Sequence, residues 1–371
     1  MKIAVVAHIR HPIAEPFMGG MEAHSRMLCD GLRRNGHDVV LFASARSSDM
    51  DLVPVCQAPY EDVLPWRVHR GTPELASFQD RAFAYAWQRI VADGFDVVHN
   101  NSLYPGIIGW AVRDNVPCVS SQHVPPFGKM REAVEASAAD PIVQHTVTSR
   151  DQMSLWSARA QRNMAVVHNG VETDRWQPGA GDADYLVWAG RITPNKGTSH
   201  AVRAARLGGL PMHVFGPVED ARYFTEEVEP FLADGVEYHG HVSLATLRPI
   251  IGRARGMVVT PLWDEPFGLV AAEALSCGTP VCAFDNGALA EVVGDCGHVV
   301  PPRDVEALAD AMGRIDAIDR NACRKRALER FSSTAMITGY ERAYERAVDA
   351  LLHQAARPFA SSHSSTTALL A

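Results

Sequence analysis

Short apolar runs alternate with amphipathic stretches along almost the whole chain. The amphipathic stretches, such as Glu22–Arg34 and Ser77–Val91, have the apolar spacing of helices. Strands that alternate with helices are typical of parallel, doubly wound α/β sheets. The predicted strands are Ile3–Ala7, Val39–Ala43, Val97–His99, Cys118–Ser120, Val143–Thr148, Val166–Val167, Tyr185–Ala189, Met212–Phe215, Val236–Tyr238, Met257–Thr260, Val281–Ala283 and His298–Val300.

The alternation forms two successive series, which indicates two similar domains that face a cleft. A chain of 371 residues also exceeds the size at which one hydrophobic core stops growing. The polar stretch Thr173–Asp184, rich in Pro and Gly, has the composition of a linker. We expect Rossmann-like domains over residues 1–168 and 169–335, a helix over residues 336–356 that packs back toward the first domain, and a disordered tail over residues 357–371.

The stretch Leu262–Gly278 sets two carboxylates in an apolar context. Pro266 suits the first turn of a helix and Gly278 suits its left-handed end, so a helix is predicted between them. Glu265 lies just ahead of it, where unpaired N–H groups favour an acid. Glu273 lies within it, where a carboxylate is costly unless hydrogen bonds are donated to it. The two acids indicate a binding site, although simple capping by Glu265 and a solvent-facing Glu273 stay open.

Candidate phosphate-binding residues follow the strand Tyr185–Ala189. The sequence G-R-I-T-P-N-K-G over residues 190–197 places Arg191 and Lys196 on a strand-to-helix turn, where cations and the helix dipole favour phosphate. Only four of the 35 basic residues are lysines, so Lys196 indicates that a compact ammonium group is wanted there. An ordinary solvated charge is the alternative. The turn is not a P-loop, because its second glycine follows the lysine.

Two further features would face the same cleft, since ligands bind beyond the carboxyl ends of parallel strands. Gly19 and Gly20 precede a helix, and paired glycines there let backbone N–H groups approach an anion. A flexible turn is the alternative for this pair. His99 and His123 each follow a strand, and we assign His99 a structural role and place His123 in the site.

Composition narrows the classes of function. The net charge of −8 argues against a nucleic-acid partner, and no apolar run is long enough to span a membrane. The seven cysteines lack C-x-x-C spacing, which is typical of free thiols in a reducing compartment, so we expect a cytoplasmic protein. Two D-x-D triplets, Asp49–Asp51 and Asp182–Asp184, lie in polar loops away from any nucleotide-type turn, so we assign no metal site.

The stretches G-R-I-T-P-N-K-G (190–197) and E-P-F-G-L-V-A-A-E-A-L-S-C-G-T-P-V (265–281) resemble the retaining glycosyltransferases of family 4. That family has two facing Rossmann-like domains, the GT-B fold. Gly19-Gly20, Asp96-Val97-Val98-His99 and His168-Asn169-Gly170-Val171 add to the resemblance. It covers nearly the whole chain except the Ser-rich tail and residues 44–78, and it implies a bacterial, metal-independent hexosyltransferase.

The resemblance also implies a role for each candidate residue. The catalytic set would be His123, Arg191, Lys196 and Glu265. Arg191 and Lys196 would hold the donor diphosphate, with the loop of Gly19 and Gly20 closing from the other domain. Glu265 would contact the donor sugar and Glu273 the ribose, with His123 beside the transferred sugar. The backbone N–H groups of Phe267, Gly268 and Leu269 would assist Glu265, and Gly216 and Val242 would frame the nucleobase.

The family's reaction transfers a hexose with retained configuration from a nucleoside-diphosphate sugar to a hydroxyl group. We expect a UDP-sugar before a GDP-sugar as donor, and a saccharide or natural product, bound by the N-terminal domain, as acceptor. The departing phosphate helps to take the acceptor proton, so no protein nucleophile, cofactor or metal is required. We expect no nucleic-acid or integral-membrane partner and allow a weak homodimer. The alternatives are a nucleotide-sugar epimerase or phosphorylase of the same architecture, and a non-catalytic nucleotide-sugar-binding module.

Overall fold

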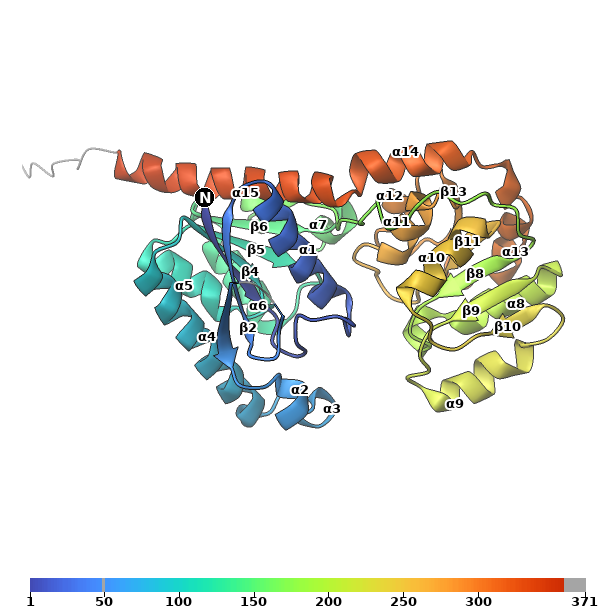
Figure 1. The fold of residues 1–371 in the computed structure, drawn as a ribbon, viewed down its shortest axis with the longest axis horizontal. Helices are drawn as coiled ribbons and strands as arrows, with labels where there is room; N and C mark the ends of the chain where they lie inside the picture. The colour runs from blue at the N-terminus through green and yellow to red at the C-terminus, as the bar shows by residue number, and fades with distance from the viewer. Residues whose placement is uncertain (49–50, 357–371) are drawn as a thin grey trace, which may run out of the picture.

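A computed structural model describes residues 1–48 and 51–356, which form two α/β halves (Figure 1). Each half is built on one parallel sheet with hydrophobic clusters on both of its faces. The predicted fold class is therefore confirmed. Asp49 and the tail predicted to be disordered lie outside the described residues.

The two sheets share one strand order. It is β3-β2-β1-β4-β5-β6-β7 in the first half and β10-β9-β8-β11-β12-β13 in the second. In each sheet the order reverses at a switch point, between β1 and β4 and between β8 and β11, which is where such folds bind ligands. The strands are β1 (Lys2–Ala7), β2 (Asp38–Ser44), β3 (Leu52–Cys56), β4 (Val97–Asn101), β5 (Cys118–Gln122), β6 (Val143–Val147), β7 (Met164–Val166), β8 (Leu186–Ala189), β9 (Met212–Phe215), β10 (Val236–Tyr238), β11 (Gly256–Val259), β12 (Val281–Phe284) and β13 (Gly297–Val300).

Helices make most of the crossovers between strands, as parallel pairing requires. The helices are α1 (Gly20–Arg34), α2 (Tyr60–Val63), α3 (Trp66–His69), α4 (Pro73–Asp93), α5 (Gly106–Asp114), α6 (Gly128–Ser137), α7 (Arg150–Ser154), α8 (Thr198–Gly208), α9 (Ala221–Tyr223), α10 (Leu244–Arg253), α11 (Leu269–Ser276), α12 (Leu289–Val293), α13 (Val305–Gly313), α14 (Arg320–Arg330) and α15 (Ser333–Ala355). Short helical turns are η1 (Ala160–Asn163), η2 (Pro194–Lys196), η3 (Phe224–Val228), η4 (Glu229–Phe231) and η5 (Ile315–Ala317).

Two elements differ from the prediction, and both differences have local causes. Strand β3 was not predicted, and it contains Pro54, which lacks a backbone N–H; the position is tolerated because β3 is an edge strand. Helix α11 begins at Leu269 and not near Pro266, because Gly268 adopts a left-handed conformation (φ 84°) that turns the chain just before the helix. Gly278 (φ 70°) follows the helix end as predicted.

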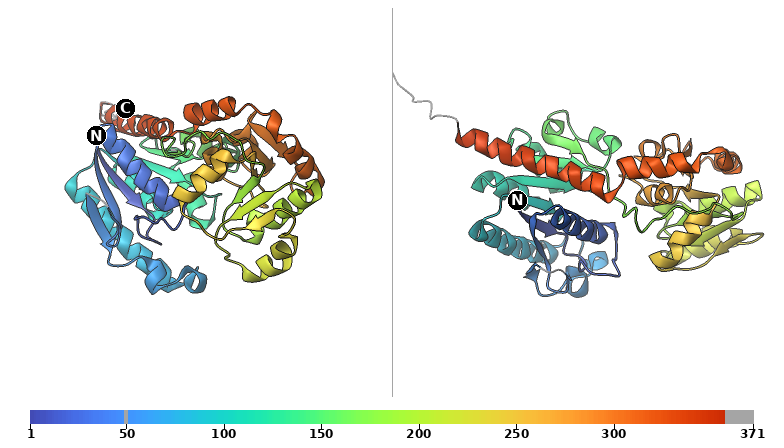
Figure 2. Two further views of the ribbon diagram at one scale, coloured as in Figure 1. Left: turned by 45° about the vertical axis from the view of Figure 1, so that its right-hand side comes forward. Right: turned by 45° about the horizontal axis from the view of Figure 1, so that its top comes forward.

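Helix α15 lies along the first sheet and not the second (Figure 2). Its residues Tyr340 and Tyr344 are fully buried there with side chains of β1 and α1. The Tyr344 hydroxyl lies 2.7 Å from His99 Nδ1, and the Ser121 hydroxyl lies 2.9 Å from His99 Nε2. His99 therefore belongs to a buried structural network, and the last helix covers one face of the first domain.

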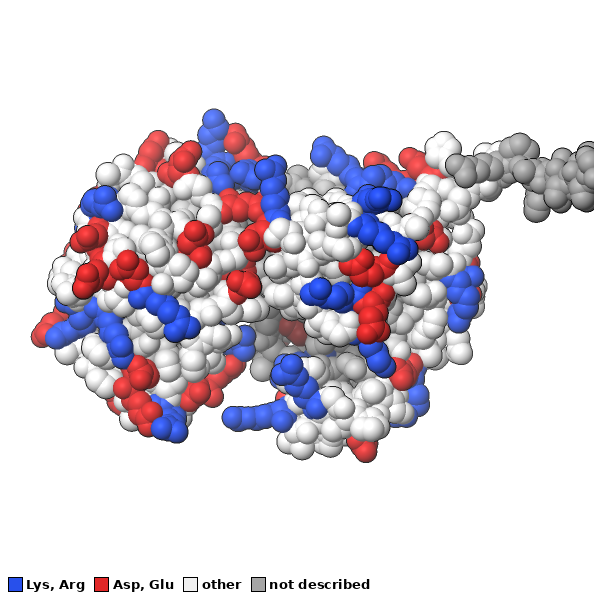
Figure 3. Space-filling view, turned by 180° about the vertical axis from the view of Figure 1, so that it is seen from behind, with Lys and Arg blue, Asp and Glu red and all other residues white. Residues whose placement is uncertain are grey.

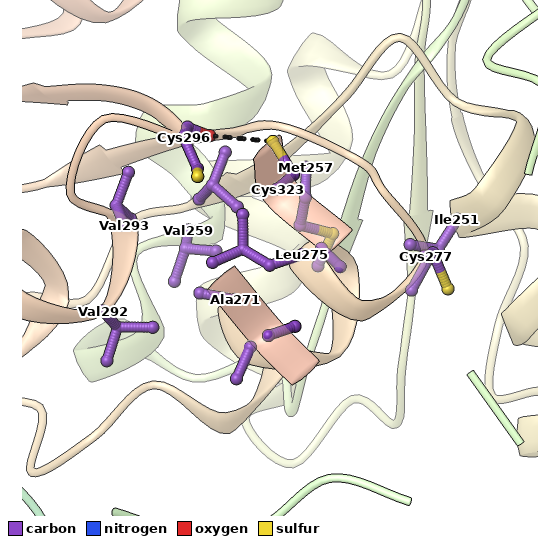
Figure 4. Close-up of a cluster of buried hydrophobic side chains, with 14 of the residues drawn as sticks. Ile251, Met257, Val259, Ala271, Leu275, Cys277, Val292, Val293, Cys296 and Cys323 are labelled. Carbon is purple, nitrogen blue, oxygen red and sulfur yellow. Dashed lines mark hydrogen bonds between the residues drawn. The ribbon is translucent and has the colours of Figure 1, made fainter. Parts of the chain in front are cut away.

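The core of the second half surrounds α11 (Figure 4). Ala271 and Leu275 of this helix pack against β11 and β12, and Cys296 and Cys323 lie in the same cluster. The Cys323 thiol donates to the Cys296 carbonyl oxygen over 3.7 Å. All seven cysteines are free.

The surface carries both signs of charge. Basic and acidic side chains are interspersed on the face in Figure 3, and a hollow separates the two halves over part of that face. Among the described residues, no helix combines the length and the apolar character needed to cross a membrane.

Candidate functional site

The loops after β8 and β11 lie side by side, because these strands are neighbours at the switch point of the second sheet. The first loop ends in Gly197 (φ 66°), where an added Cβ would lie 2.0 Å from the Thr260 carbonyl oxygen. The Leu262 N–H donates to the Asn195 carbonyl oxygen over 2.8 Å. A glycine is therefore required at position 197, and this close approach sets the β8 loop against the loop that carries Glu265.

Lys196 and Glu265 meet across these two loops. Lys196 Nζ lies 2.7 Å from Glu265 Oε2, and Trp263 Nε1 donates to the same oxygen over 3.0 Å. The two charged side chains are 26% and 14% exposed. A partly exposed pair of this kind contributes little to stability. It leaves a cation and an acid that can exchange partners when a ligand enters.

The backbone around Glu265 is fixed by its neighbours. The Ala288 N–H donates to the Glu265 carbonyl oxygen over 2.9 Å. An added Cβ at Gly287 (φ 61°) would lie 2.4 Å from that oxygen. Beyond it the chain enters α11 without a side-chain cap, so the N–H groups that open the helix are available to a ligand. Leu269 is the first residue of the helix and Gly268 caps it, while Phe267 lies just before the cap.

Glu273 lies one turn into α11, partly buried in the surrounding core. Burial raises the pKa of Glu273 from its ordinary value to about 8, and the charge of Arg248 on α10 opposes that rise. The Arg248 guanidinium lies 5.3 Å from the centroid of the Trp176 ring, and its buried Nε has no hydrogen-bond partner among the described residues. This corner of the site has unmet hydrogen-bonding capacity, which a polar ligand can satisfy.

Arg191 is engaged elsewhere. Its Nη1 lies 3.0 Å from Glu219 Oε2, and both side chains are exposed. The structure thus brings Lys196 to Glu265 but pairs Arg191 with Glu219. An exposed pair of this kind is weak, so Arg191 is free to exchange Glu219 for another anion.

Glycines line the carboxyl ends of β8 and β9. An added Cβ at Gly216 (φ 138°) would lie 1.8 Å from the Gly190 carbonyl oxygen, so only glycine fits there. The Gly216 N–H donates to the Gly240 carbonyl oxygen over 2.9 Å, and Tyr238 donates its hydroxyl to the Gly216 carbonyl oxygen over 2.8 Å. Val242 packs partly buried against the core that contains α11. Gly216 and Val242 thus lie on successive crossovers at one end of the sheet.

Gly19 and Gly20 open helix α1, whose first turn is directed toward the second half (Figure 1). Gly19 is extended, and no side chain caps the helix. Both glycines are exposed, and an added Cβ at Gly20 would meet no atom within 4 Å. The open N–H groups of this helix end suit an anion.

His123 belongs to a buried chain of hydrogen bonds in the first half. Its Nε2 lies 2.7 Å from Asn101 Oδ1, while Asn101 Nδ2 lies 3.1 Å from His24 Nδ1 and 2.8 Å from Ser25 Oγ. A carbonyl oxygen only accepts, so His123 carries its proton on Nε2, and His24 donates from Nε2 to the Tyr340 hydroxyl over 3.0 Å. Burial lowers the pKa of His123 to about 4, so the ring is neutral at pH 7.

Hydrogen bonds join the two halves beside this site. Thr148 Oγ1 donates to the Pro266 carbonyl oxygen over 2.8 Å. Glu291 on α12 accepts from the Arg150 N–H over 2.7 Å and lies 2.8 Å from His168 Nε2. The residue next to Glu265 is thus anchored to the N-terminal half.

Sequence reasoning missed four residues that shape the site. Trp263 stands two positions before Glu265, so its indole N–H could have been read as a donor. Gly287 follows a predicted strand, and Asn101 directly follows another strand end beside the residues considered there. Nothing in the sequence indicated Arg248, because it comes near Glu273 only in the folded domain.

Both halves match family models. Residues 18–175 match the model described as Glycosyltransferase Family 4, and residues 183–316 match the one described as Glycosyl transferases group 1. The chain is 30% identical to the D-inositol 3-phosphate glycosyltransferase of Mycobacterium tuberculosis (strain F11), over 95% of this chain and 82% of the relative. It is 29% identical to the protein of the same name from Mycolicibacterium smegmatis, over 85% of this chain and 83% of the relative.

Solved structures share the fold. A sucrose-phosphate synthase from Thermosynechococcus elongatus superposes with a TM-score of 0.77 at 22% identity, covering 94% of this chain and 99% of the other. A glycosyltransferase involved in avilamycin A biosynthesis gives 0.70 at 23% identity, covering 94% and 98%. The Anabaena protein HepE in complex with UDP-glucose gives 0.68 at 16% identity, covering 93% and 99%.

Proposed function

The chain belongs to glycosyltransferase family 4, and from this premise we propose that it transfers a hexose, with retained configuration, from a nucleoside-diphosphate sugar to a hydroxyl group of a small acceptor. The observation that carries the proposal is the convergence of Lys196 and Glu265 at the switch point, 2.7 Å apart. Glu273 follows one turn into the next helix with its raised pKa. A ligand with a diphosphate and several hydroxyls supplies partners for all three groups.

The proposed reaction requires the protein to stabilise the departing phosphate. The acceptor oxygen forms a bond to the anomeric carbon, the bond from that carbon to the phosphate oxygen breaks, and the acceptor proton passes to the departing phosphate. Lys196, with Arg191 released from Glu219, neutralises the charge that grows on the phosphate. The N–H groups of Phe267, Gly268 and Leu269 and the carboxylate of Glu265 orient the sugar, and Glu273 accepts from the ribose hydroxyls.

The first half supplies the other wall of the site. His123, neutral and protonated on Nε2, lies beside the transferred sugar, and the Gly19-Gly20 entrance of α1 faces the diphosphate. Gly216 and Val242 frame the nucleobase. In this scheme the chain's own side chains and backbone N–H groups act on the donor.

We propose a UDP-sugar as donor, since HepE, which has the same fold, was solved in complex with UDP-glucose. We propose a saccharide or a natural product as the acceptor. D-inositol 3-phosphate is the second candidate, because relatives 29–30% identical to this chain are named for that acceptor.

The test combines stabilisation and turnover. UDP-, GDP- and ADP-hexoses are first ranked by the rise in melting temperature. The best donor is then incubated with polyols, saccharides and D-inositol 3-phosphate, and nucleoside diphosphate release is measured. The proposal expects release only when donor and acceptor are both present. Interconversion of the sugar without acceptor would point to an epimerase, phosphate-dependent cleavage to a phosphorylase, and stabilisation without any turnover to a binding module.

A further inference from the structure

A second cluster of ligating groups lies on the second sheet, apart from the Lys196–Glu265 pair. His213 on β9 and Glu237 on β10 are register partners, and His239 follows Glu237 by two residues, so the three side chains share one face of the sheet. Their ligand atoms all lie within 4.8 Å of one another. We propose that His213, Glu237 and His239 bind one divalent transition-metal ion, such as Zn²⁺ or Co²⁺.

Both imidazole rings are held in orientation by aromatic stacking. His213 stacks on Tyr185 with ring centroids 4.2 Å apart and planes 14° apart. His239 stacks on Phe215 at 5.1 Å and 18°. The Tyr185 hydroxyl is itself fixed by donation to the Ile250 carbonyl oxygen over 3.2 Å. Rings held in this way lose little freedom when they bind an ion.

The distances are close to those of a bound site. Ligand bonds of about 2.0–2.2 Å in tetrahedral geometry place donor atoms roughly 3.4 Å apart. Glu237 Oε2 and His239 Nε2 are already 3.5 Å apart, and the two imidazole centroids are 4.6 Å apart. Among the described residues, no hydrogen bond is made by the ring nitrogens of His213 or His239, and their one ion pair is that of His239 with Glu237. Small side-chain rotations complete the set, and water fills the remaining positions.

Two imidazoles and one carboxylate select the kind of ion. Imidazole ligands suit Zn²⁺, Co²⁺ and Ni²⁺, whereas Mg²⁺ and Ca²⁺ prefer sites made entirely of oxygen ligands. Strand β10 has three residues and lies at the edge of its sheet. An ion shared between β9 and β10 would fasten this short edge strand to its neighbour. The site does not depend on the proposed transfer reaction.

The test uses the untagged full chain, freed of metal by a chelator. Equilibrium dialysis should give one bound Zn²⁺ per chain, and Co²⁺ should give a visible ligand-field spectrum without thiolate charge transfer. At a hundredfold excess of Zn²⁺ over its Kd, we expect the melting temperature to rise by about 5 °C. His213→Ala, His239→Ala and Glu237→Gln should each weaken binding by about tenfold or more. His353→Ala, at an exposed histidine of α15, is the matched control and should bind like the wild type.

Three outcomes would contradict the proposed metal site. Wild-type binding well below one equivalent, binding by all three variants as tight as that of the wild type, or a thiolate-to-cobalt charge-transfer band from a cysteine would each overturn the proposal. Should His213→Ala fail to fold because its ring is partly buried, the exposed His239→Ala and Glu237→Gln decide the question. Folding of each variant is checked by circular dichroism without metal.

Discussion

The two walls of the proposed donor site differ in their electrostatics. In the first half, His123 Nε2, both polar atoms of the Asn101 side chain and both ring nitrogens of His24 have hydrogen-bond partners. Burial lowers the pKa of His123 to about 4. In the second half, Lys196 and Glu265 hold each other, while the raised pKa of Glu273 reflects a buried acid that lacks compensation. The first wall is therefore neutral and held by hydrogen bonds, whereas the second contains an ion pair and an acid with unmet hydrogen-bonding capacity.

This difference indicates which half positions the reacting groups and which half binds the charged donor. A pre-formed neutral network costs nothing to reorganise, so it suits the positioning of a reacting group. Charges paired only with each other exchange readily for the charges of a substrate, and a buried neutral acid such as Glu273 gains hydrogen bonds from one. If the comparison is right, changes in the second half should alter donor binding and leaving-group stabilisation, and changes in the first half should alter turnover at constant donor affinity.

The largest effect is expected from the cation at the switch point. Lys196→Ala removes the ammonium that stabilises charge on the departing phosphate, and we expect kcat/KM to fall by about 10²–10³-fold. Arg191→Ala should act in the same direction with a similar size. The measurement is nucleoside diphosphate release at saturating acceptor. Lys325→Ala, which touches only an exposed i,i+4 pair on α14, is the control, and a Lys196→Ala variant as active as that control would contradict the proposed diphosphate grip.

A smaller effect should come from the neutral wall. In Asn101→Asp, both side-chain oxygens accept, so His24 loses its donor and the orientation of His123 is disturbed. We expect kcat to fall about 10- to 100-fold, as small displacements of positioned groups do, with an unchanged donor Kd. A raised pKa in the kcat profile would accompany the loss, because a carboxylate beside the rings favours their protonated form.

The control for Asn101 is Asn163→Ala in the same half. Asn163 is also a buried asparagine, and its amide donates to the backbone carbonyl oxygens of Ser137, Asp140 and Val143. This change destabilises the domain without touching His123. If Asn163→Ala lost as much kcat as Asn101→Asp, the distinction between the two walls would fail. It would also fail if Asn101→Asp, but not Asn163→Ala, bound the donor more weakly.

The third prediction concerns the unpaired acid. Glu273 has a pKa of about 8 in the folded protein, above its ordinary value of 4.5, so between these pH values the folded chain holds a proton that the unfolded chain has lost. Its contribution to stability is present below pH 4.5 and is lost as pH rises toward 8, at up to about 1.4 kcal/mol per pH unit.

Glu273→Gln removes this titration. Melting temperatures measured from pH 5 to pH 8 should therefore fall more steeply for the wild type than for the variant, while donor stabilises the wild type more than the variant at pH 8. Glu329→Gln, on the exposed surface of α14, should follow the wild type. Parallel curves for wild type and Glu273→Gln would mean that Glu273 already has a partner without ligand.

The sequence predicted the alternation of strands and helices because each element carries its own hydrophobic period. The sequence did not predict β3, because Pro54 is unusual in a strand and is tolerated here only at the sheet edge. It also placed the start of α11 too early, because the left-handed Gly268 turns the chain just before the helix. Both cases depend on position within the sheet or on backbone conformation, which local composition encodes poorly.

The sequence named Lys196 and Glu265 as candidate site residues but gave no sign that they contact each other. Lys196 and Glu265 meet because β8 and β11 are neighbours, a non-local pairing that no periodicity reveals. Arg191 belongs to the same turn as Lys196, yet its side chain pairs with Glu219. Asn101 and Arg248 matter through partners brought from other elements, so only the three-dimensional arrangement assigns them a place.

The smallest predicted effect concerns the hydrogen bond between Thr148 and Pro266, which connects the two halves. The Thr148 hydroxyl has one proton and two acceptors at 2.8 Å, Gln152 Oε1 and the Pro266 carbonyl oxygen. Gln152 Oε1 already accepts the Thr148 N–H, so the hydroxyl is free to serve Pro266. Thr148→Val keeps the shape and removes this bond, which should cost about 1 kcal/mol of stability. Thr246→Val, at an exposed position in α10, is the comparison. Because Pro266 adjoins Glu265, a rise in KM for donor with unchanged kcat should accompany the loss, and a change in kcat alone would place Thr148 with the first wall.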